Sequence, residues 1–293
     1  MANNSTISIV TPTLNQGRFI EDTIKSLWNQ KGPFFIEHII VDGGSTDNTI
    51  SIIKKYEQRL KKKNYPIKCK GIKLSWSSGK DKGQSEALNK GFKKAKGYYL
   101  SWLNSDDYYC SNNSLNHIYK TFLYHPKIDI VLGNFNTVDV IGNQVAANNS
   151  IFDTVQGKIN RNKLVKICQL SIISQPSTFF KKELLSSCRL DNNYHFSMDW
   201  DLWIQAYLNK LSFYKINKDI AYERIQPEAK TVINHKLMYQ EWVKVYKKHD
   251  LWQKEKYVFY KNILKLQLSS LPISKYFINK LNLLGISIKG LRS

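Results

Sequence analysis

Short apolar runs and helical periodicity alternate along the first part of the chain. The β-rich run at 7–10 leads into a polar loop, and residues 20–28 then repeat apolar side chains at helical spacing. A second apolar run at 37–41 ends at Asp42 and is followed by helical periodicity over 49–60. Strand, loop and helix in this repeated order predict an α/β fold with a mostly parallel sheet.

The same alternation continues further along the chain. We expect strands over 72–76 and 98–103, and helices over 85–94, 113–122 and 198–208. A Gly-Asn turn at 142–143, between β-rich runs, predicts a hairpin within 128–147. A hairpin would make the sheet mixed rather than purely parallel, and Ser197 is a candidate cap for the last of these helices.

The composition changes near residue 235, where Lys, Tyr, Trp and Leu recur at helical spacing until Pro272 interrupts them. We therefore divide the chain into a catalytic and nucleotide-binding domain at 1–232 and a basic, amphipathic helical region at 233–293. No internal repeat or low-complexity linker separates the two.

Composition narrows the classes of function. The 293 residues are 42% apolar, which excludes full disorder, and 44 Lys and Arg against 23 Asp and Glu give a net charge of +21. A surface this basic favours anionic partners: phosphates, acidic lipid headgroups or nucleic acid. Four scattered cysteines and the lack of a long apolar run favour a cytosolic protein that does not cross a membrane.

Carboxylates follow several of the predicted strands despite this positive excess. Asp42 follows one strand, Asp81 another, and Asp106 with Asp107 a third. Such residues are ordinary in turns and helix caps, but three acidic loops at the carboxyl ends of parallel strands would meet at one edge of the sheet. Adjacent carboxylates there favour a bound Mg²⁺ or Mn²⁺ that bridges to a diphosphate. Phosphate-loop and dinucleotide glycine motifs are absent.

A second acidic pair lies in the segment SMDWDLW. Asp199 and Asp201 are two residues apart, about 200° around a helix, so only one of them can face a given cleft. Asp199 shares a helix face with Leu202 and Trp203, which favours a general base acting on a hydroxyl. The simpler interpretation is that both carboxylates only stabilise the helix N-terminus.

Five ordered motifs carry a specific resemblance. They are TPTLNQGRFIEDTIKSLWNQ, HIIVDGGSTDNT, GKDKGQSEALNKGF, WLNSDD and MDWDLW. In this order and spacing, over residues 5–205, the chain resembles the inverting family 2 glycosyltransferases of the GT-A fold. The resemblance implies a Rossmann-like α/β domain with a mixed, mostly parallel sheet flanked by helices, to which the C-terminal helical region is added.

The resemblance also implies roles for single residues. The nucleotide-sugar would contact Thr11, Pro12, Asn15, Asp42, Asp81, Lys82, Asn104, Ser105, Arg224 and Lys230. Asp106, with Asp107, would hold Mn²⁺ or Mg²⁺, and Asp199 would be the catalytic base. Gln175, Asp201 and Trp203 are assigned to the acceptor side.

Three positions depart from the family pattern. Leu14 stands where many relatives have a Tyr stacked on the base, and Asn104 replaces a ribose-binding Asp. Gln226, in ERIQPEAKT, stands where relatives often have a His that contacts metal or phosphate. These departures affect base recognition and the charge of the metal site.

The implied reaction is a single in-line displacement that inverts the sugar. The donor would be a nucleoside-diphosphate sugar, most simply a UDP-sugar, and the acceptor a hydroxyl of a lipid-linked glycan or a growing surface polysaccharide. Two other classes remain open: a nucleic-acid-binding protein, which the charge permits but the scarcity of Arg and the acidic loops disfavour, and an inactive nucleotide-sugar-binding module or nucleotidyltransferase.

The basic C-terminal region has two interpretations. Residues 236–293 carry 12 basic and 3 acidic side chains, a balance of 12 − 3 = +9, interleaved with Trp, Tyr and Leu. Such a segment can lie on an anionic membrane surface, or can pack on the catalytic domain with its Lys side chains in water. The first would place a cytoplasmic enzyme on the inner face of the membrane, near polyprenyl-diphosphate-linked acceptors.

Overall fold

The computed structural model describes residues 5–146, 156–160, 173–226 and 235–251. The chain divides into two compact units, 1–245 and 246–293. In the second unit only 246–251 are described, so most of the basic C-terminal region lies outside the described residues. None of the helices in the described ranges is long and apolar enough to cross a lipid bilayer.

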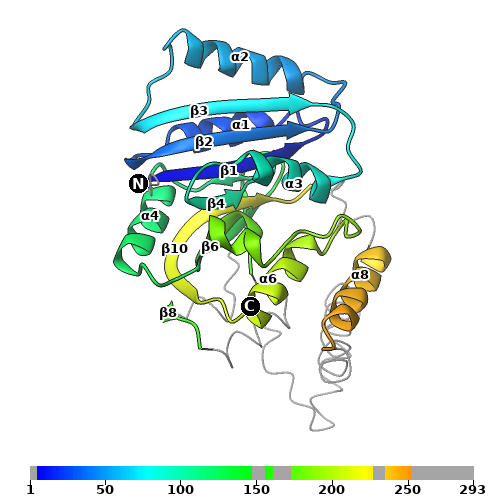
Figure 1. The fold of residues 1–293 in the computed structure, drawn as a ribbon. Helices are drawn as coiled ribbons and strands as arrows, with labels where there is room; N and C mark the ends of the chain where they lie inside the picture. Colours follow the sequence, from blue (N-terminus) through cyan, green and yellow to red (C-terminus); the bar gives the residue numbers. More distant parts are fainter. Residues whose placement is uncertain (1–4, 147–155, 161–172, 227–234, 252–293) are drawn as a thin grey trace, which may run out of the picture. The chain divides into compact units, whose positions relative to one another are not determined.

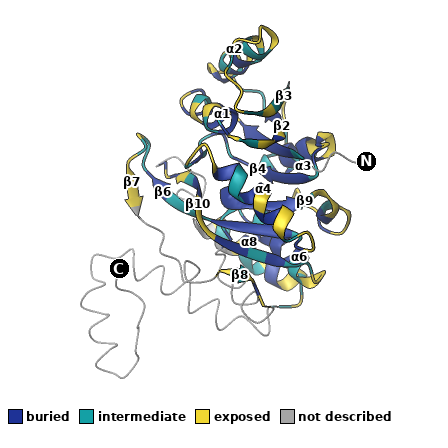
Figure 2. Ribbon diagram, turned by 90° about the vertical axis from the view of Figure 1, so that its left-hand side faces the viewer, coloured by how far each residue is buried: buried dark blue, intermediate teal, exposed yellow. Residues whose placement is uncertain are grey.

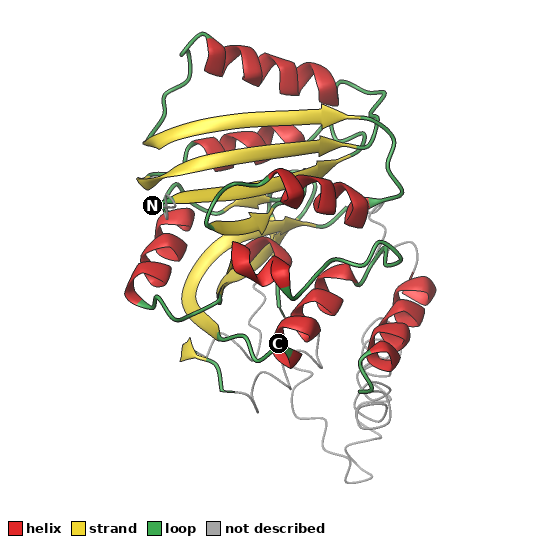
Figure 3. Cartoon of the chain, in the orientation of Figure 1, coloured by secondary structure: helices red, strands yellow, loops and turns green. Residues whose placement is uncertain are grey.

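Strands and helices alternate through the first unit, as Figure 3 shows. The helices are α1 (Ile20–Trp28), α2 (Thr49–Lys61), α3 (Gln84–Lys94), α4 (Ser114–Tyr124), α6 (Met198–Leu208) and α8 (His235–Lys248), with short 3₁₀ turns η1 (Gln175–Ser177) and η2 (Lys182–Ser186). The strands are β1 (Thr6–Thr13), β2 (Gly32–Asp42), β3 (Cys69–Ser78), β4 (Tyr99–Trp102), β5 (Tyr108–Tyr109), β6 (Ile130–Val138), β7 (Gln144–Ala146), β8 (Gly157–Lys158), β9 (Thr178–Lys181) and β10 (Phe213–Arg224).

One mixed sheet joins these strands in the order β3-β2-β1-β4-β9-β6-β10-β5, with β7 on β6 and β8 on β10. The first four are mutually parallel and β10 is parallel to β6, whereas β9 runs antiparallel to both of its neighbours. Parallel strands carry their carboxyl ends to the same edge, so the loops after β1, β2, β3 and β4 meet there (Figure 1).

Alternating side chains of β1 serve opposite faces of the sheet. Ile7 and Ile9 join the main core with side chains of α1 and α4, while Val10 faces α3. Helix α3 reaches β1 closely because Gly91 has no side chain: a Cβ there would lie 2.3 Å from Val10 Cγ1. The dark central strands of Figure 2 are therefore covered on both sides, as parallel sheets require.

A buried histidine links three of these elements. The Trp28 indole N–H donates to His38 Nδ1 at 3.1 Å, and His38 Nε2 lies 3.0 Å from Thr11 Oγ1. Since Nδ1 accepts, the proton of the neutral ring sits on Nε2 and is donated to Thr11. Burial lowers the pKa of His38 from 6.5 to about 3, so the ring is neutral in the folded protein.

The sequence predicted most of these elements within a few residues. The mixed α/β fold and the 128–147 hairpin are present, the latter as β6 and β7 with Gly142 at φ 93°. Two boundaries differ. Strand β1 continues through Thr13, because the residues taken for a loop pair in register with β2, and β2 begins at Gly32, where we expected only a helix stop. The boundary between the two compact units lies within α8, and the functional division at 232–233 stays a prediction.

We predict that His38 makes the protein less stable in acid. A folded-state pKa below the unfolded one means that the unfolded chain binds the extra proton, so the stabilisation is present above pH 6.5 and is lost as pH falls towards 3. In urea unfolding between pH 6.5 and 5, His38→Gln should lower the slope of the unfolding free energy against pH by up to about 1.4 kcal/mol per pH unit. Equal slopes for the two proteins would contradict this.

Candidate active site

The turn after β4 is built around the buried carboxylate of Asp107. Its Oδ1 accepts the backbone N–H of Arg224 at 3.1 Å, and its Oδ2 accepts the Asn104 side-chain amide at 3.1 Å. The side chain is 2% exposed, and burial with the neighbouring Asp106 raises its pKa well above the ordinary value. Both oxygens of Asp107 therefore accept hydrogen bonds that hold the turn. Of the two residues, Asp106 is the better candidate for a cation ligand.

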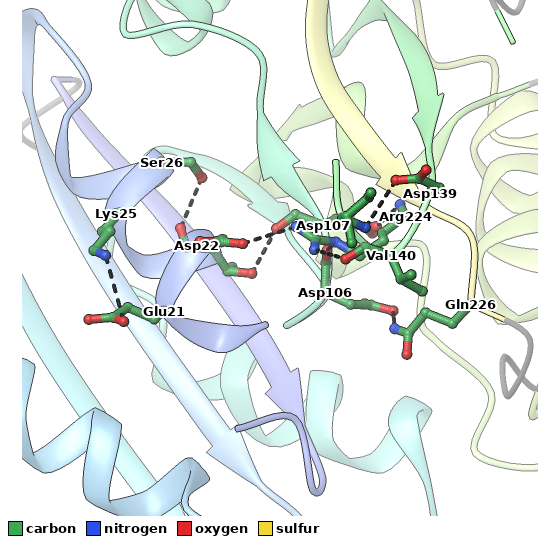
Figure 4. Close-up of polar contacts among 12 residues, drawn as sticks. Glu21, Asp22, Lys25, Ser26, Asp106, Asp107, Asp139, Val140, Arg224 and Gln226 are labelled. Carbon is green, nitrogen blue, oxygen red and sulfur yellow. Dashed lines mark hydrogen bonds and ion pairs between the residues drawn. The ribbon is translucent and has the colours of Figure 1, made fainter. Parts of the chain in front are cut away.

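Arg224, at the end of β10, ties this turn to α1. Its Nε donates to the Asp106 carbonyl at 3.1 Å, Nη1 to the Val140 carbonyl at 3.0 Å, and Nη2 to Asp22 Oδ2 at 3.1 Å, as Figure 4 shows. The guanidinium also lies 4.6 Å from the centre of the Phe19 ring. We expected Arg224 to contact diphosphate; the structure instead directs all three of its nitrogens to protein groups.

Asp106 is only partly buried, and its side chain is held from one side. Gln226 donates its amide to Asp106 Oδ2 at 2.5 Å (Figure 4). Burial raises the pKa of Asp106, and this outweighs the opposing effects of Gln226 and of the Arg224 charge. The residue that replaces the family's His therefore contacts the candidate metal ligand directly.

Sequence reasoning missed Glu223, which lies beside these residues. Tyr222 and Arg224 both face Tyr108, so Glu223, between them on β10, faces the opposite way. Its side chain is exposed, yet burial, Asp106 and Asp199 raise its pKa to about 7. Water reaches this carboxylate although many protein atoms surround it. Its position, at a strand end among acidic loops, is the same signal that marked Asp42.

Asp199 belongs to the same site. It lies in the first turn of α6, is partly buried, and accepts the Trp200 backbone N–H at 2.7 Å. Burial raises its pKa to about 6. Because Glu223 interacts electrostatically with both Asp106 and Asp199, the three carboxylates share one environment, and we call them the acidic cluster.

The two other side chains predicted near Asp199 are turned inward. Asp201 is fully buried, with Oδ2 accepting the Gln205 amide at 2.7 Å. Trp203 is 1% exposed and stacks on Trp102, with ring centres 5.8 Å apart at 14°. Both lie in the core, which corrects their assignment to the acceptor side. The 200° argument correctly separated the two acids.

The loops after β1 and β2 are joined by hydrogen bonds. Asn15, at φ 52°, donates its backbone N–H to Ser45 Oγ at 2.7 Å, and its Oδ1 accepts the Thr46 N–H at 2.9 Å. Asp42 accepts the N–H groups of Gly44 and Ser45 at 3.0 Å and the Ser78 hydroxyl at 2.6 Å. Asp42 is thus 1% exposed and shapes the loop from within.

The remaining nucleotide-side residues surround these loops. The Thr11 hydroxyl is hydrogen-bonded to His38, and the side chain of Pro12 is buried. Each residue can therefore offer a ligand its backbone rather than its side chain. A Cβ at Gly43 would lie 3.0 Å from Asp81 Oδ2, which brings the third loop against the second, and Lys82 is exposed. Leu14 is 53% exposed beside them.

Near β4, Asn104 Oδ1 accepts the Gln84 amide at 2.8 Å and Ser105 is buried. Gln175 donates to the Trp102 carbonyl, and its own Oε1 is buried with no hydrogen-bond partner among the described residues. An unpaired buried acceptor at a strand end is a feature that a bound ligand can satisfy. Lys230 lies outside the described residues.

The acidic cluster fits a cation in its chemistry. Within the described ranges, no group of three His, Cys, Asp or Glu side chains is close enough to form a complete metal cage. Mg²⁺-type ions are often held by one or two carboxylates together with substrate phosphates, and need no such cage. Asp106 and Glu223 supply hard oxygen donors, and burial raises the pKa of both, so a bound cation would favour their ionised forms.

Comparisons with known proteins place the chain among glycosyltransferases. The family model for glycosyl transferase family 2 matches residues 8–187. An uncharacterised glycosyltransferase of Haemophilus influenzae is 32% identical over 139 residues, which cover 47% of this chain and 50% of that protein. TuaG of Bacillus subtilis, a putative teichuronic acid biosynthesis glycosyltransferase, is 36% identical over 101 residues, covering 34% of this chain and 36% of its own length. The matched stretches thus span half of these relatives or less.

Two solved structures share the fold. Staphylococcus aureus TarS 1–349 in complex with UDP-GlcNAc has a TM-score of 0.61 at 22% identity, covering 82% of this chain and 65% of that one. The mannosyltransferase PcManGT of Pyrobaculum calidifontis, in complex with GDP-Man and Mn²⁺, has a TM-score of 0.53 at 13% identity, covering 96% and 81%. At these identities the likeness concerns the fold, and it confirms the predicted GT-A type.

The match to the family model covers well over half of the chain and runs from the first strand to the turn beyond β9. The loops that the motifs predicted to meet do meet at the carboxyl edge of the sheet. The chain belongs to glycosyltransferase family 2.

Proposed function

We propose that the chain is an inverting glycosyltransferase that moves a sugar from a UDP-sugar to a hydroxyl group of a surface polysaccharide or lipid-linked glycan. The observation that carries the proposal is the acidic cluster, in which Glu223 interacts with both Asp106 and Asp199. A candidate ligand for the cation that would accompany the donor's diphosphate and a candidate base therefore share one environment, as a displacement at the anomeric carbon requires.

The donor class is supported by the loops and by the relatives. The loops after β1, β2 and β3 present backbone groups, Asn15 and Lys82 where a nucleotide would bind. Related structures carry UDP-GlcNAc in TarS and GDP-Man in PcManGT. We favour a uridine nucleotide because the higher TM-score belongs to the UDP-GlcNAc complex.

The chain's own residues account for the proton transfer. Asp199 removes the proton from the acceptor hydroxyl, the oxygen attacks the anomeric carbon, and the nucleoside diphosphate leaves from the opposite face. A single base suffices, so the reaction inverts the configuration without a covalent intermediate. A divalent cation held by Asp106 and Glu223, Mn²⁺ or Mg²⁺, would stabilise the negative charge of the leaving diphosphate.

The acceptor class is inferred from what related proteins are named for. TuaG is named for teichuronic acid biosynthesis, and TarS of Staphylococcus aureus, 30% identical over 102 residues, is a poly(ribitol-phosphate) β-N-acetylglucosaminyltransferase. Both names refer to polymers with many free hydroxyls. We therefore place the acceptor among such polymers or their polyprenyl-diphosphate-linked precursors, with the basic C-terminal region on the cytoplasmic face of the membrane.

We predict that Asp199→Asn abolishes transfer but leaves donor binding intact, because an amide keeps the shape and loses the basicity. The turnover should fall by about 10²- to 10⁴-fold. In the parent protein, turnover should rise with pH around 6, since Asp199 must lose its proton to act. Release of nucleoside diphosphate measured against pH, with calorimetry for the donor, tests both points.

Asp201→Asn is the matched control on the same helix. An Asn at that position still offers an oxygen to Gln205, so we expect near-normal turnover. Parent-like activity of the Asp199 variant, or an equal loss in both variants, would remove Asp199 from the mechanism.

A second prediction concerns the cation. In a thermal-shift panel of UDP-, GDP- and dTDP-sugars with and without Mn²⁺, one base class should stabilise the protein, and the stabilisation should depend on Mn²⁺. Asp106→Asn should remove the Mn²⁺-dependent part, whereas Asp107→Asn should lower the melting temperature without ligand, because Asp107 holds the turn. A full Mn²⁺ response in the Asp106 variant would exclude it as a ligand.

A third prediction concerns the membrane. The intact chain should float with anionic liposomes in low salt and less so in high salt, and removal of residues 252–293 should abolish this binding. Zwitterionic liposomes serve as the control. If the intact chain stays in solution with both lipids, the membrane part of the proposal fails and the transfer reaction is unaffected.

A further inference from the structure

Helix α6, which carries Asp199, lacks the side-chain cap that its sequence predicts. Ser197 does occupy the N-cap position, but it makes no capping hydrogen bond, and its hydroxyl is buried with no partner among the described residues. The first N–H groups of a helix, and those of the residues that lead into it, need acceptors from elsewhere when they are buried. Something other than Ser197 must therefore hold this helix start.

That role falls to Glu241 of α8. Its Oε1 accepts the backbone N–H of His195 at 2.8 Å, and its Oε2 accepts those of Phe196 at 2.8 Å and Ser197 at 3.1 Å. The next residue of α8, Trp242, packs edge-on against Trp200 with ring centres 5.3 Å apart. The loop into α6 and its first turn are thus held by α8 through both polar and aromatic contacts.

Burial of the Glu241 carboxylate favours a strong interaction with its three N–H donors. Glu241 is 7% exposed, and a buried carboxylate is costly unless several donors surround it. Here three backbone N–H groups do so, next to the positive end of the α6 dipole. Deleting the carboxylate would leave the buried Ser197 N–H and the partly buried N–H groups of His195 and Phe196 without this acceptor, so the helix start would have to move or to admit water.

The distance along the chain to the base is short. The third of the bound N–H groups belongs to Ser197, two residues before Asp199. Among the described residues, the hydrogen bond that the Asp199 side chain accepts is a local one, from the N–H of Trp200. The position at which the α6 backbone begins therefore fixes how far the Asp199 carboxylate extends towards Glu223.

We propose that Glu241 is a positioning residue for the catalytic base: from α8, it sets the start of α6 and, through it, the place of Asp199. The inference rests on the proposed role of Asp199. It makes α8 part of the transfer machinery, not merely an appended basic helix.

The test compares Glu241→Ala and Glu241→Gln with Gln240→Ala, an exposed neighbour on α8, all in the full chain. Amide hydrogen exchange of peptides that cover 195–203 should be at least about tenfold faster in Glu241→Ala and unchanged in the control. Turnover, followed as nucleoside-diphosphate release, should fall by about 10- to 100-fold, while donor KM changes less than turnover, because the loops after β1 and β2 are joined by hydrogen bonds of their own.

Glu241→Gln keeps the variant series interpretable if the alanine protein folds poorly. Its single side-chain oxygen can accept two of the three N–H groups, so both exchange and turnover should be intermediate. Parent-like exchange in Glu241→Ala, or an equal loss of donor affinity and turnover in Glu241→Gln, would overturn the proposal. If no nucleotide-sugar binds the parent protein, the proposed function fails, whereas the exchange measurements still decide whether Glu241 holds α6.

Discussion

The structure of the site depends on Arg224 and the turn it holds. This one residue contacts α1 through Asp22, the turn after β4 through Asp106 and Asp107, and the β6–β7 connection through Val140. Segments from four parts of the chain meet at its backbone and guanidinium. A planar group with five N–H donors can satisfy several acceptors at once, which a Lys could not do in the same geometry. The cost of burying the guanidinium is offset by these partners and by the Phe19 ring.

Because Arg224 is engaged in this way, its positive charge does not fully neutralise the acids around it. The chain carries a net charge of +21, yet Asp106, Glu223 and Asp199 all have raised pKa values, with burial as the largest cause. The excess of Lys elsewhere does not compensate them. On so basic a protein, a site whose carboxylates are not fully compensated by positive side chains is suited to an anionic ligand that binds together with a divalent cation.

The sequence indicated the acidic loops and the separation of Asp199 from Asp201, because both follow from periodicity and from the geometry of parallel strands. It misassigned Arg224 and Trp203 for one reason. Their residue types suit both a ligand and a core, and only the partners in space decide between them: Val140 and Asp22 for the first, Trp102 for the second. Periodicity describes a face of an element but not what that face meets.

Glu223 and Glu241 escaped prediction for a different reason. Each is a lone acid without a neighbouring motif, and its significance depends on residues that are distant in the sequence: Asp106 and Asp199 for Glu223, and the N–H groups of residues 195–197 for Glu241. The family motif in this segment pointed to Gln226 instead. It correctly singled out that position, whose amide proves to bind Asp106, but could not supply the contact.

The two halves of the site differ in how well their polar groups are satisfied. On the nucleotide side, the Asp42 carboxylate and the side-chain oxygen of Asn15 accept hydrogen bonds from neighbouring loops, so this part is built before any ligand binds. In the acidic cluster, by contrast, burial opposes the ionised state of each carboxylate, and the charges of Asp106 and Asp199 further oppose that of Glu223. Folded proteins satisfy most buried polar groups, and the exceptions concentrate where ligands and chemistry supply the missing partner. For the proposed reaction, this contrast favours donor recognition by the preformed loops after β1 and β2, and proton transfer at the acidic cluster.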